Sequence, residues 1–273
     1  MLTVSIVTYH TDPDELRRCL KSLDSPAVKR IYVVDNSTDA TTEQLCGEYP
    51  NVTYIPHENR GYGAGHNAAL RRVIAEDEAK FHLVVNSDVR FRPEILRRMV
   101  SFMERHPGVG QMQPRLLNPD GSMQWTVRRL PTPLDLIGRR FLPRRWMERR
   151  DDRYLLKHLD HDRPLNVPYH QGSFMLLRID ALKRAGLFDE RFFMYPEDID
   201  LTRRIHRHYV TLYWPHEEAT HDHRAASYHS GRMLRIHMVN MARYFCKWGW
   251  LIDKERRRIN RRLDNGCCYV DLR

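Results

Sequence analysis

The first ninety residues alternate short apolar segments with amphipathic ones, and this alternation restricts the fold more than any other feature. We predict four strands, at 3–9, 30–34, 52–55 and 81–85. Between them we predict three helices, at 12–23, 42–49 and about 65–78. Strands that alternate with helices of this length form βαβ units and a mostly parallel sheet. The chain is therefore predicted to be an α/β protein.

Polar residues follow each of these predicted strands. They are Thr8-Tyr9-His10, Asp35-Asn36, Asn59-Arg60-Gly61 and Asn86-Ser87-Asp88. In an open α/β sheet, ligands bind outside the carboxyl ends of the strands. Loop chemistry alone explains any single polar turn, but it gives no reason for acids and amides at every strand end. We expect these side chains to line one crevice.

Asp88 is the candidate metal ligand, because it follows the apolar strand 83–85. One carboxylate at a strand end can anchor Mg²⁺ or Mn²⁺ when phosphate oxygens and water fill the other positions. An Asx-type turn that closes the strand explains the same residue without a metal. Both interpretations stay open at this point.

Asp198 is the candidate proton acceptor. It lies at the predicted start of a helix, after the aromatic stretch 192–195, where apolar walls would favour general-base chemistry. Acids in a first helical turn also complement the helix dipole, which is a structural alternative. Asp200 has the spacing for ion pairs with Arg203 and Arg204, so we predict that it is mainly structural.

Two further segments are weaker candidates for ligand contact. The segment 59–67 reads N-R-G-Y-G-A-G-H-N, whose glycines permit close backbone approach before a helix N-terminus that favours an anion. It is neither a GxGxxG fingerprint nor a P-loop. His221 and His223 could bind a metal or a diphosphate, although alternating histidines on a short strand are often merely exposed.

The net charge of +10 is concentrated in two regions. Residues 139–153 hold seven arginines against three acids, and residues 228–263 hold ten Lys/Arg against two acids. Basic surfaces attract polyanions such as nucleic acid, anionic lipid or diphosphate substrates, or are simply solvated helix faces. Five cysteines without metal spacing indicate free thiols. Because no apolar run approaches about 20 residues and no signal peptide is evident, we expect a cytoplasmic active site.

Seven motifs in order resemble glycosyltransferase family 2, in the branch of bacterial rhamnosyltransferases and similar cell-surface polysaccharide enzymes. The matching segments are VSIVTYH at 4–10, IYVVDNSTD at 31–39, ENRGYGAGHN at 58–67, LVVNSDV at 83–89, GSFMLLR at 172–178, GLFDERFFMYPEDIDLTRRI at 186–205 and THDHRAAS at 220–227. The resemblance implies a GT-A fold and inverting sugar transfer. The donor would be a nucleotide sugar (a dTDP- or UDP-sugar, possibly of rhamnose), and the acceptor a glycan or polyprenyl-diphosphate-linked saccharide.

The resemblance also implies roles for individual residues. It assigns substrate contacts to Thr8, Tyr9, Asp35, Asn36, Arg60, Gly61, Asn67, Asn86 and Ser87. The first four would contact the nucleobase and ribose. Asp88 would bind the divalent metal, Mg²⁺ or Mn²⁺, and His221 would approach the metal or diphosphate, with His223 as the competing choice. Asp198 would be the base, with Glu197 beside it.

One position departs from the family pattern. The family is usually described by a DxD metal motif, and Asn86 stands at its first position. Asparagine is a neutral oxygen ligand, so metal affinity would be lower and strict metal dependence stays open. The rhamnosyltransferase-like branch itself often has Asn there, so the resemblance holds.

Three parts of the chain are expected. Residues 1–100 would form the nucleotide-sugar-binding half, 101–228 the acceptor-binding half, and 229–273 a basic amphipathic helical segment. We predict a long helix from about Ser230 with an apolar stripe at Leu234, Met238, Met241, Phe245, Trp248 and Ile252. Its aromatic and basic residues suit peripheral contact with anionic membrane. We expect the stripe itself to pack on the catalytic domain, while the role of the arginines stays open.

Three functions other than glycosyl transfer would each require different sequence features. A sugar-nucleotide pyrophosphorylase would need a Gly-rich, basic loop after the first strand, where this chain has 8–12 in the sequence T-Y-H-T-D. A nucleic-acid-binding module would need a recognisable reader motif, and none is present. A catalytically inactive relative that binds glycan or nucleotide would be expected to lose Asp88 or Asp198, and both are present.

Overall fold

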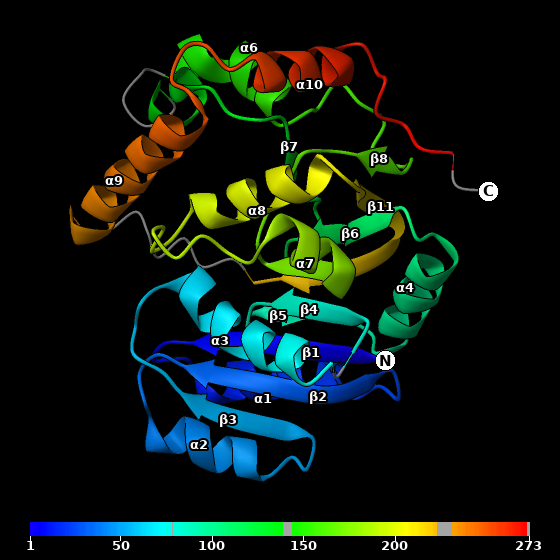
Figure 1. Ribbon diagram of the computed structural model, residues 1–273, viewed down its shortest axis with the longest axis vertical. Helices are drawn as coiled ribbons and strands as arrows, with labels where there is room; N and C mark the ends of the chain where they lie inside the picture. Colours follow the sequence, from blue (N-terminus) through cyan, green and yellow to red (C-terminus); the bar gives the residue numbers. More distant parts are fainter. Residues whose placement is uncertain (78, 139–143, 223–230, 272–273) are drawn as a thin grey trace.

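The computed structural model describes residues 1–77, 79–138, 144–222 and 231–271, which form an α/β protein (Figure 1). The first half contains, in chain order, β1 (Leu2–Thr8), α1 (Pro13–Ser22), β2 (Val28–Asp35), α2 (Ala40–Gly47), β3 (Val52–Pro56), α3 (Tyr62–Ala75), β4 (Phe81–Val85), β5 (Val89–Arg90) and α4 (Glu94–Arg105). The second half contains β6 (Val109–Leu117), β7 (Val127–Arg128), the π-helical turn η1 (Leu134–Gly138), α6 (Arg144–Tyr154), β8 (Leu165–Asn166), β9 (Tyr169–His170), β10 (Phe174–Arg178), α7 (Ile179–Ala185), α8 (Pro196–His206), β11 (Val210–His221), α9 (Gly231–Trp248) and α10 (Lys254–Asp264).

One mixed sheet organises the protein. Across the described ranges it has nine strands in the order β3-β2-β1-β4-β10-β6-β11-β5, with β8 paired to β11. The strands β3, β2, β1 and β4 are mutually parallel, and β6 is parallel to β11. Strand β10 runs antiparallel between β4 and β6. The predicted α/β class with a mostly parallel central sheet is confirmed.

Helices cover both faces of this sheet. α1, α2 and α4 bury side chains such as Leu16 and Leu96 in one core, together with Val4 of β1. α3, α7 and α8 pack on the opposite face through side chains such as Leu70 and Leu201. Strands buried on both faces read as nearly continuous apolar runs, which is why β1, β2 and β4 were recognisable in the sequence. Strand β3 is the half-buried edge strand.

Local sequence sets the helix boundaries. Asp12 caps α1, because its Oδ1 accepts hydrogen bonds from the backbone N–H of Asp14 and Glu15 at 2.8 and 3.3 Å. α7 ends at Gly186, whose φ of +81° suits a residue without a β-carbon. Among the described helices, none combines the length and apolar character that crossing a bilayer requires.

A buried polar chain fixes α3 to the sheet. Ser5 Oγ lies 2.7 Å from His66 Nδ1 and 2.8 Å from His82 Nε2. Burial lowers the pKa of His82 to about 3, so its imidazole is neutral and can share hydrogen bonds without the cost of a buried charge. This chain orients α3, whose first residue is Tyr62, against β1 and β4.

The C-terminal helices form a cap at the end of the molecule opposite β3 (Figure 1). Phe245 of α9 and Leu263 of α10 share a core with Phe192 and Ile199. The prediction that the apolar stripe packs on the rest of the protein is therefore confirmed. Its predicted extent is wrong, because α9 ends at Trp248 and Gly249 adopts a φ of +102° before α10 begins.

Strand β11 spans Val210–His221. It pairs with β6 along most of its length, with a register shift between Trp214 and Glu218. Its last residues also reach β5, where His221 is the register partner of Val89.

Candidate active site

The carboxyl ends of β1 and β2 are joined by a buried hydrogen bond. Thr8 Oγ1 donates to Asp35 Oδ1 at 3.0 Å, and Asp35 also accepts from the backbone N–H of Ser37 and Asp39 at 3.1 and 2.6 Å. Burial raises the pKa of Asp35, but these hydrogen bonds outweigh it and hold the pKa below its usual value. Thr8 and Asp35 are fully buried and brace the loop after β2. Their contacts with the nucleotide stay a prediction.

The residues that follow them differ in exposure. Asn36 is buried, and its Oδ1 lies 2.9 Å from His57 Nδ1. Tyr9 is 57% exposed at the end of β1. Of the four predicted nucleobase contacts, Tyr9 therefore has the side chain most open to a ligand.

The glycines of 59–67 serve packing inside the protein. A β-carbon on Gly61 would lie 2.1 Å from Phe193 O, and one on Gly65 would lie 2.7 Å from Val7 Cγ2. The backbone N–H of Tyr62, at the start of α3, donates to Phe193 O at 3.0 Å. The predicted close approach to an anion is corrected accordingly, because these positions approach the protein's own 193 loop and β1.

Asn67 also has a structural role, and its contact with the nucleotide stays a prediction. It is 1% exposed, and its Nδ2 donates to Phe188 O and Glu190 Oε1 at 2.9 and 2.8 Å. Its Oδ1 accepts from the Phe188 N–H at 3.1 Å. These bonds tie α3 to the segment before α8. Arg60, by contrast, is exposed just before α3.

Asp198 lies in the first turn of α8 and is almost completely buried. Its Oδ2 accepts from the Gly172 N–H at 2.9 Å, and its Oδ1 accepts from the Ile199 N–H at 2.7 Å. Burial raises the pKa of Asp198 to about 7, against the opposing effect of these hydrogen bonds. Burial and the neighbouring Asp198 charge raise the pKa of Glu197 well above its usual value. A carboxylate with a pKa near neutrality suits a general base.

Tyr62 connects this acid to the loop after β4. Its hydroxyl lies 2.8 Å from Gly172 O and 3.0 Å from Asn86 Oδ1. Gly172 also bonds to Asp198, so three segments far apart in the sequence meet here. Sequence reasoning missed Tyr62 and Gly172, although an aromatic residue within a glycine-rich segment was a usable signal.

Asp88 and His221 face each other across β5 and β11. His221 Nε2 lies 3.3 Å from Asp88 Oδ1, and Gln124 Oε1 lies 2.9 Å from His221 Nδ1. The backbone N–H of Asp222 donates to Asp88 O at 2.9 Å. One carboxylate and one oriented imidazole fit a divalent cation whose other positions are filled by phosphate oxygens and water. In the described ranges, no group of three or more His, Cys, Asp or Glu side chains offers a complete protein cage.

The two polar residues before Asp88 in the motif, Asn86 and Ser87, form hydrogen bonds to other parts of the protein. Asn86 Oδ1 is engaged by Tyr62, and Ser87 Oγ donates to Glu15 Oε1 at 2.6 Å. Ser87 therefore anchors the loop to α1, and its substrate contact stays a prediction. His223, the competing metal ligand, lies outside the described residues.

Residues 3–186 match the family model described as Glycosyl transferase family 2. The chain belongs to this family. This glycosyltransferase is 32% identical over 257 residues to the N-acetylglucosaminyl-diphospho-decaprenol L-rhamnosyltransferase of Mycobacterium tuberculosis strain H37Rv, covering 88% of this chain and 80% of that relative. It is 26% identical over 267 residues to rhamnosyltransferase WbbL of Escherichia coli strain K12, covering 93% and 97%. The predicted membership of the family is confirmed.

Solved structures support the same fold. The mannosyltransferase PcManGT of Pyrobaculum calidifontis, in complex with GDP-Man and Mn²⁺, superposes with a TM-score of 0.56 at 18% identity. That match covers 89% of this chain and 64% of the other, so this chain spans less than two thirds of that protein. Residues 1–349 of S. aureus TarS give a TM-score of 0.53 at 19% identity, covering 90% and 72%. The glycosyltransferase has the predicted GT-A fold.

Arg128 is a third residue that the sequence did not reveal. It lies on β7, with its guanidinium 5.3 Å from the Tyr169 ring centre and 5.8 Å from that of Tyr154. Its Nη1 donates to the Tyr169 hydroxyl at 3.2 Å. Its positive charge acts to lower the pKa of Asp198, against the larger effect of burial. No motif surrounds 126–129, so only the pairing of β7 with β9 places it here.

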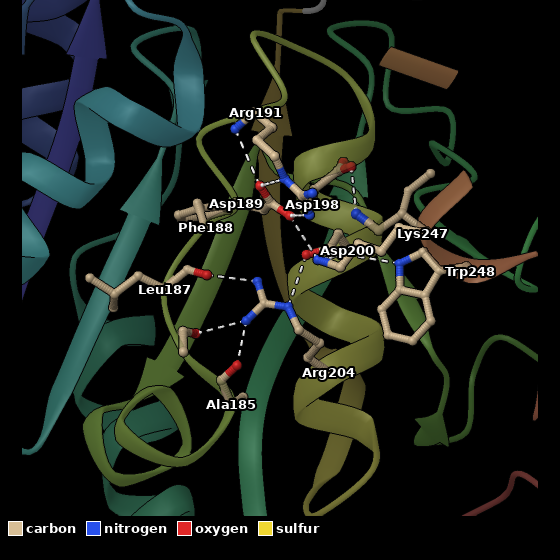
Figure 2. Close-up of polar contacts among 12 residues, drawn as sticks. Ala185, Leu187, Phe188, Asp189, Arg191, Asp198, Asp200, Arg204, Lys247 and Trp248 are labelled. Atoms are coloured by element: carbon tan, nitrogen blue, oxygen red, sulfur yellow. Dashed lines mark hydrogen bonds and ion pairs between the residues drawn. The ribbon is translucent and has the colours of Figure 1, made fainter. Parts of the chain in front are cut away.

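Asp200 joins α8, the helix that carries Asp198 in its first turn, to α9 (Figure 2). It is fully buried, and its Oδ2 accepts from Arg204 Nε at 2.9 Å. Its Oδ1 accepts from Lys247 Nζ at 2.7 Å and from Trp248 Nε1 at 2.8 Å. The predicted structural role and the Arg204 pair are confirmed. The predicted pair with Arg203 is wrong, because Arg203 bonds to acids at the start of α10.

Proposed function

We propose that this glycosyltransferase inverts the anomeric configuration as it moves a sugar from a dTDP- or UDP-sugar to a hydroxyl of a glycan or polyprenyl-diphosphate-linked saccharide. The observation that carries this proposal is the buried Asp198, whose raised pKa suits a base and whose orientation is fixed by the Gly172 N–H. Tyr62 links Gly172 to the loop that leads to Asp88. The hydrogen bonds of Tyr62 therefore connect the proposed base to the loop of the proposed diphosphate site.

In the proposed reaction, Asp198 accepts the proton of the acceptor hydroxyl as that oxygen attacks the anomeric carbon. The new C–O bond forms on the face opposite the diphosphate, and the bond to the diphosphate oxygen breaks with its electron pair. A single displacement of this kind inverts the configuration. Glu197, buried beside the base, would help to orient a substrate. Tyr9 and Arg60, both exposed at the strand ends, are the proposed nucleotide contacts.

Asp88 and His221 are the residues that would hold Mg²⁺ or Mn²⁺. A divalent ion there would supply positive charge to the departing diphosphate. Asn86 is engaged by Tyr62, so it does not act as the missing acid of a DxD motif. We therefore propose metal binding through Asp88 and His221, with donor phosphates completing the site.

The relatives support the finer choices of substrate and place. The name of the mycobacterial relative specifies a diphospho-decaprenol-linked acceptor and L-rhamnose, so a polyprenyl-diphosphate acceptor and a rhamnose donor are the first to test. Acceptors of that kind are anchored in membrane. We infer that the reaction takes place in the cytoplasm, at the inner face of the cytoplasmic membrane.

Thermal unfolding with a panel of dTDP-, UDP- and GDP-sugars, with and without Mn²⁺, tests the donor site. We expect one nucleotide class to stabilise the protein, by about 2.7 kcal/mol at a hundred times its Kd. Asp88→Ala should lose the part of this shift that depends on Mn²⁺, because it removes the carboxylate ligand.

Asp24→Ala is the matched control, since Asp24 is an exposed carboxylate on the loop after α1. It should keep the full Mn²⁺-dependent shift. If no nucleotide sugar stabilises the wild type, the donor-site assignment is wrong. If Asp88→Ala keeps the Mn²⁺ effect, the metal site lies elsewhere.

A further inference from the structure

A groove with a volume of about 880 Å³ lies in the C-terminal cap, between η1 and α10. It is away from the proposed active site, and neither the catalytic nor the donor-binding proposal uses it. Four arginines and one acid line it, together with apolar side chains. The arginines are Arg129, Arg256, Arg257 and Arg261, and the acid is Asp264.

The groove carries an excess of positive charge. Asp264 Oδ1 lies 3.2 Å from Arg129 Nη1 and 3.5 Å from Arg153 Nε, so one carboxylate serves two guanidinium groups. Within the described residues, the buried Nε of Arg129 has no hydrogen-bond partner. Burial, with the nearby charges of Arg150 and Arg153, lowers the pKa of Arg129.

Arg256 is buried, and its guanidinium donates to the backbone carbonyls of Pro131, Gly249 and Trp250. Arg257 and Arg261 are exposed, so an anion with several acceptor oxygens, such as a phosphate group, would pair with these two.

Exposed apolar side chains border the same groove. Of the eight large apolar side chains that are exposed in the described ranges, three line this groove: Leu134, Trp250 and Leu251. Ile252 follows directly in the sequence. Leu251 and Ile252 are 78% and 74% exposed. The turn that presents them is fixed by Gly249, because a β-carbon there would lie 2.6 Å from Ile252 O. Trp and aliphatic residues beside arginines are the composition expected at a membrane interface.

The aromatic residues of α9 are not part of this surface. Phe245 is fully buried, and Trp248 stacks 4.0 Å below the Arg203 guanidinium while its indole bonds to Asp200. This agrees with the expectation that the apolar stripe of α9 packs on the rest of the protein. Trp250, in the turn after α9, is exposed.

Strand β7 connects the groove to the surroundings of Asp198. Arg128 packs on Tyr169, and its charge acts to lower the pKa of Asp198. The next residue in the sequence, Arg129, lines the groove.

We propose that this groove binds the phosphate headgroup of an anionic phospholipid in a bilayer, with Trp250, Leu251 and Ile252 inserted at the interface. The cations match the headgroup charge, and the exposed apolar turn matches the start of the acyl region. Docking of this kind would hold the active site at the level of a membrane-anchored diphosphate. This consequence for the acceptor rests on the function proposed above, whereas lipid binding itself does not.

Cosedimentation with vesicles tests the proposal. The wild type should sediment with phosphatidylcholine vesicles that contain phosphatidylglycerol and remain in solution with phosphatidylcholine alone. Arg257→Glu/Arg261→Glu should weaken binding at least about tenfold. Leu251→Ser/Ile252→Ser should also weaken it, although this variant leaves the charge unchanged.

The matched control is Arg97→Glu/Arg105→Glu, which makes the same charge change at exposed positions of α4. It should bind vesicles like the wild type. Equal losses of binding in this control and in Arg257→Glu/Arg261→Glu would mean that net charge alone attracts the protein. That result would rule out the groove as the lipid-binding site. Failure of the wild type to bind, or stabilisation by soluble glycerol phosphate without vesicle binding, would also overturn the proposal.

A readout from the donor site separates this proposal from the proposed function. Arg257→Glu/Arg261→Glu should keep the thermal shift with the nucleotide sugar, because the groove does not contact the strand ends. Loss of vesicle binding with an intact donor shift supports docking through the groove. If the wild type binds vesicles but no nucleotide sugar, the proposed glycosyl-transfer mechanism is contradicted. The proposal that the groove binds lipid would still hold.

Discussion

Replacing Asp198 by Asn should lower kcat by about 10²- to 10⁴-fold, the range expected when a general base is removed. The amide keeps the size of the side chain but cannot accept the acceptor's proton. Donor binding should change little, because Asp198 lies at the start of α8 and the proposed nucleotide contacts lie at the ends of β1 and β3. Steady-state kinetics with donor thermal shifts would measure both effects.

Stability and pH dependence distinguish this loss from unfolding. Because burial raises the pKa of Asp198 to about 7, wild-type kcat/KM should fall as the pH drops below about 7, where the carboxyl becomes protonated. Asp198→Asn should lack this acidic limb. Its melting temperature should stay close to that of the wild type, since the variant buries a neutral group in place of a carboxylate. Near wild-type turnover in Asp198→Asn would rule out this residue as the base.

Replacing Asp200 by Ala, two residues along the same helix, should instead destabilise the fold by about 3–5 kcal/mol. The change would leave Arg204 and Lys247 without their buried carboxylate and would remove the acceptor of the Trp248 indole (Figure 2). Because α9 would lose its anchor on α8, local opening should begin at this contact. Urea unfolding would give the change in free energy.

Asp152→Ala is a matched control for the stability effect. Asp152 pairs with Lys157 at 2.7 Å on the surface, where an ion pair contributes less than about 1 kcal/mol. A comparable loss of stability in both variants would contradict the buried role of Asp200. Helix α8 thus carries two buried carboxylates: Asp198 is the proposed general base, and Asp200 stabilises the contact between α8 and α9.

The first half of the fold could be predicted because its strands are buried on both faces and alternate with capped helices. Asp88 and Asp198 were recognisable as candidates, since each follows a clear element and stands in a motif. Membership of the family required no structure. What the sequence shows well is therefore local: periodicity, caps and short motifs.

Contacts between distant segments could not be predicted in the same way. Strand β10 enters the sheet between β4 and β6, and only this pairing brings Gly172 beside Asp198. Tyr62 gains its position from the same juxtaposition. Asn67 looked like a ligand contact because its motif is polar, yet its amide bonds to Phe188 and Glu190 in the folded protein.

Buried and exposed polar residues were also indistinguishable in the sequence. Thr8 and Asp35 look as available as Tyr9, but only the fold shows that the first two bond to each other. The exposed turn 250–252 was hidden within a predicted helix. Its position depends on the positive φ of Gly249, which helical spacing does not reveal.

The anomeric configuration of the product tests the central claim most directly. The purified protein would be given a nucleotide sugar that stabilises it, together with a saccharide acceptor, and the first product would be followed by proton NMR. A single displacement with Asp198 as base predicts one product whose anomeric configuration is opposite to that of the donor. A product that retains the donor configuration would contradict the account.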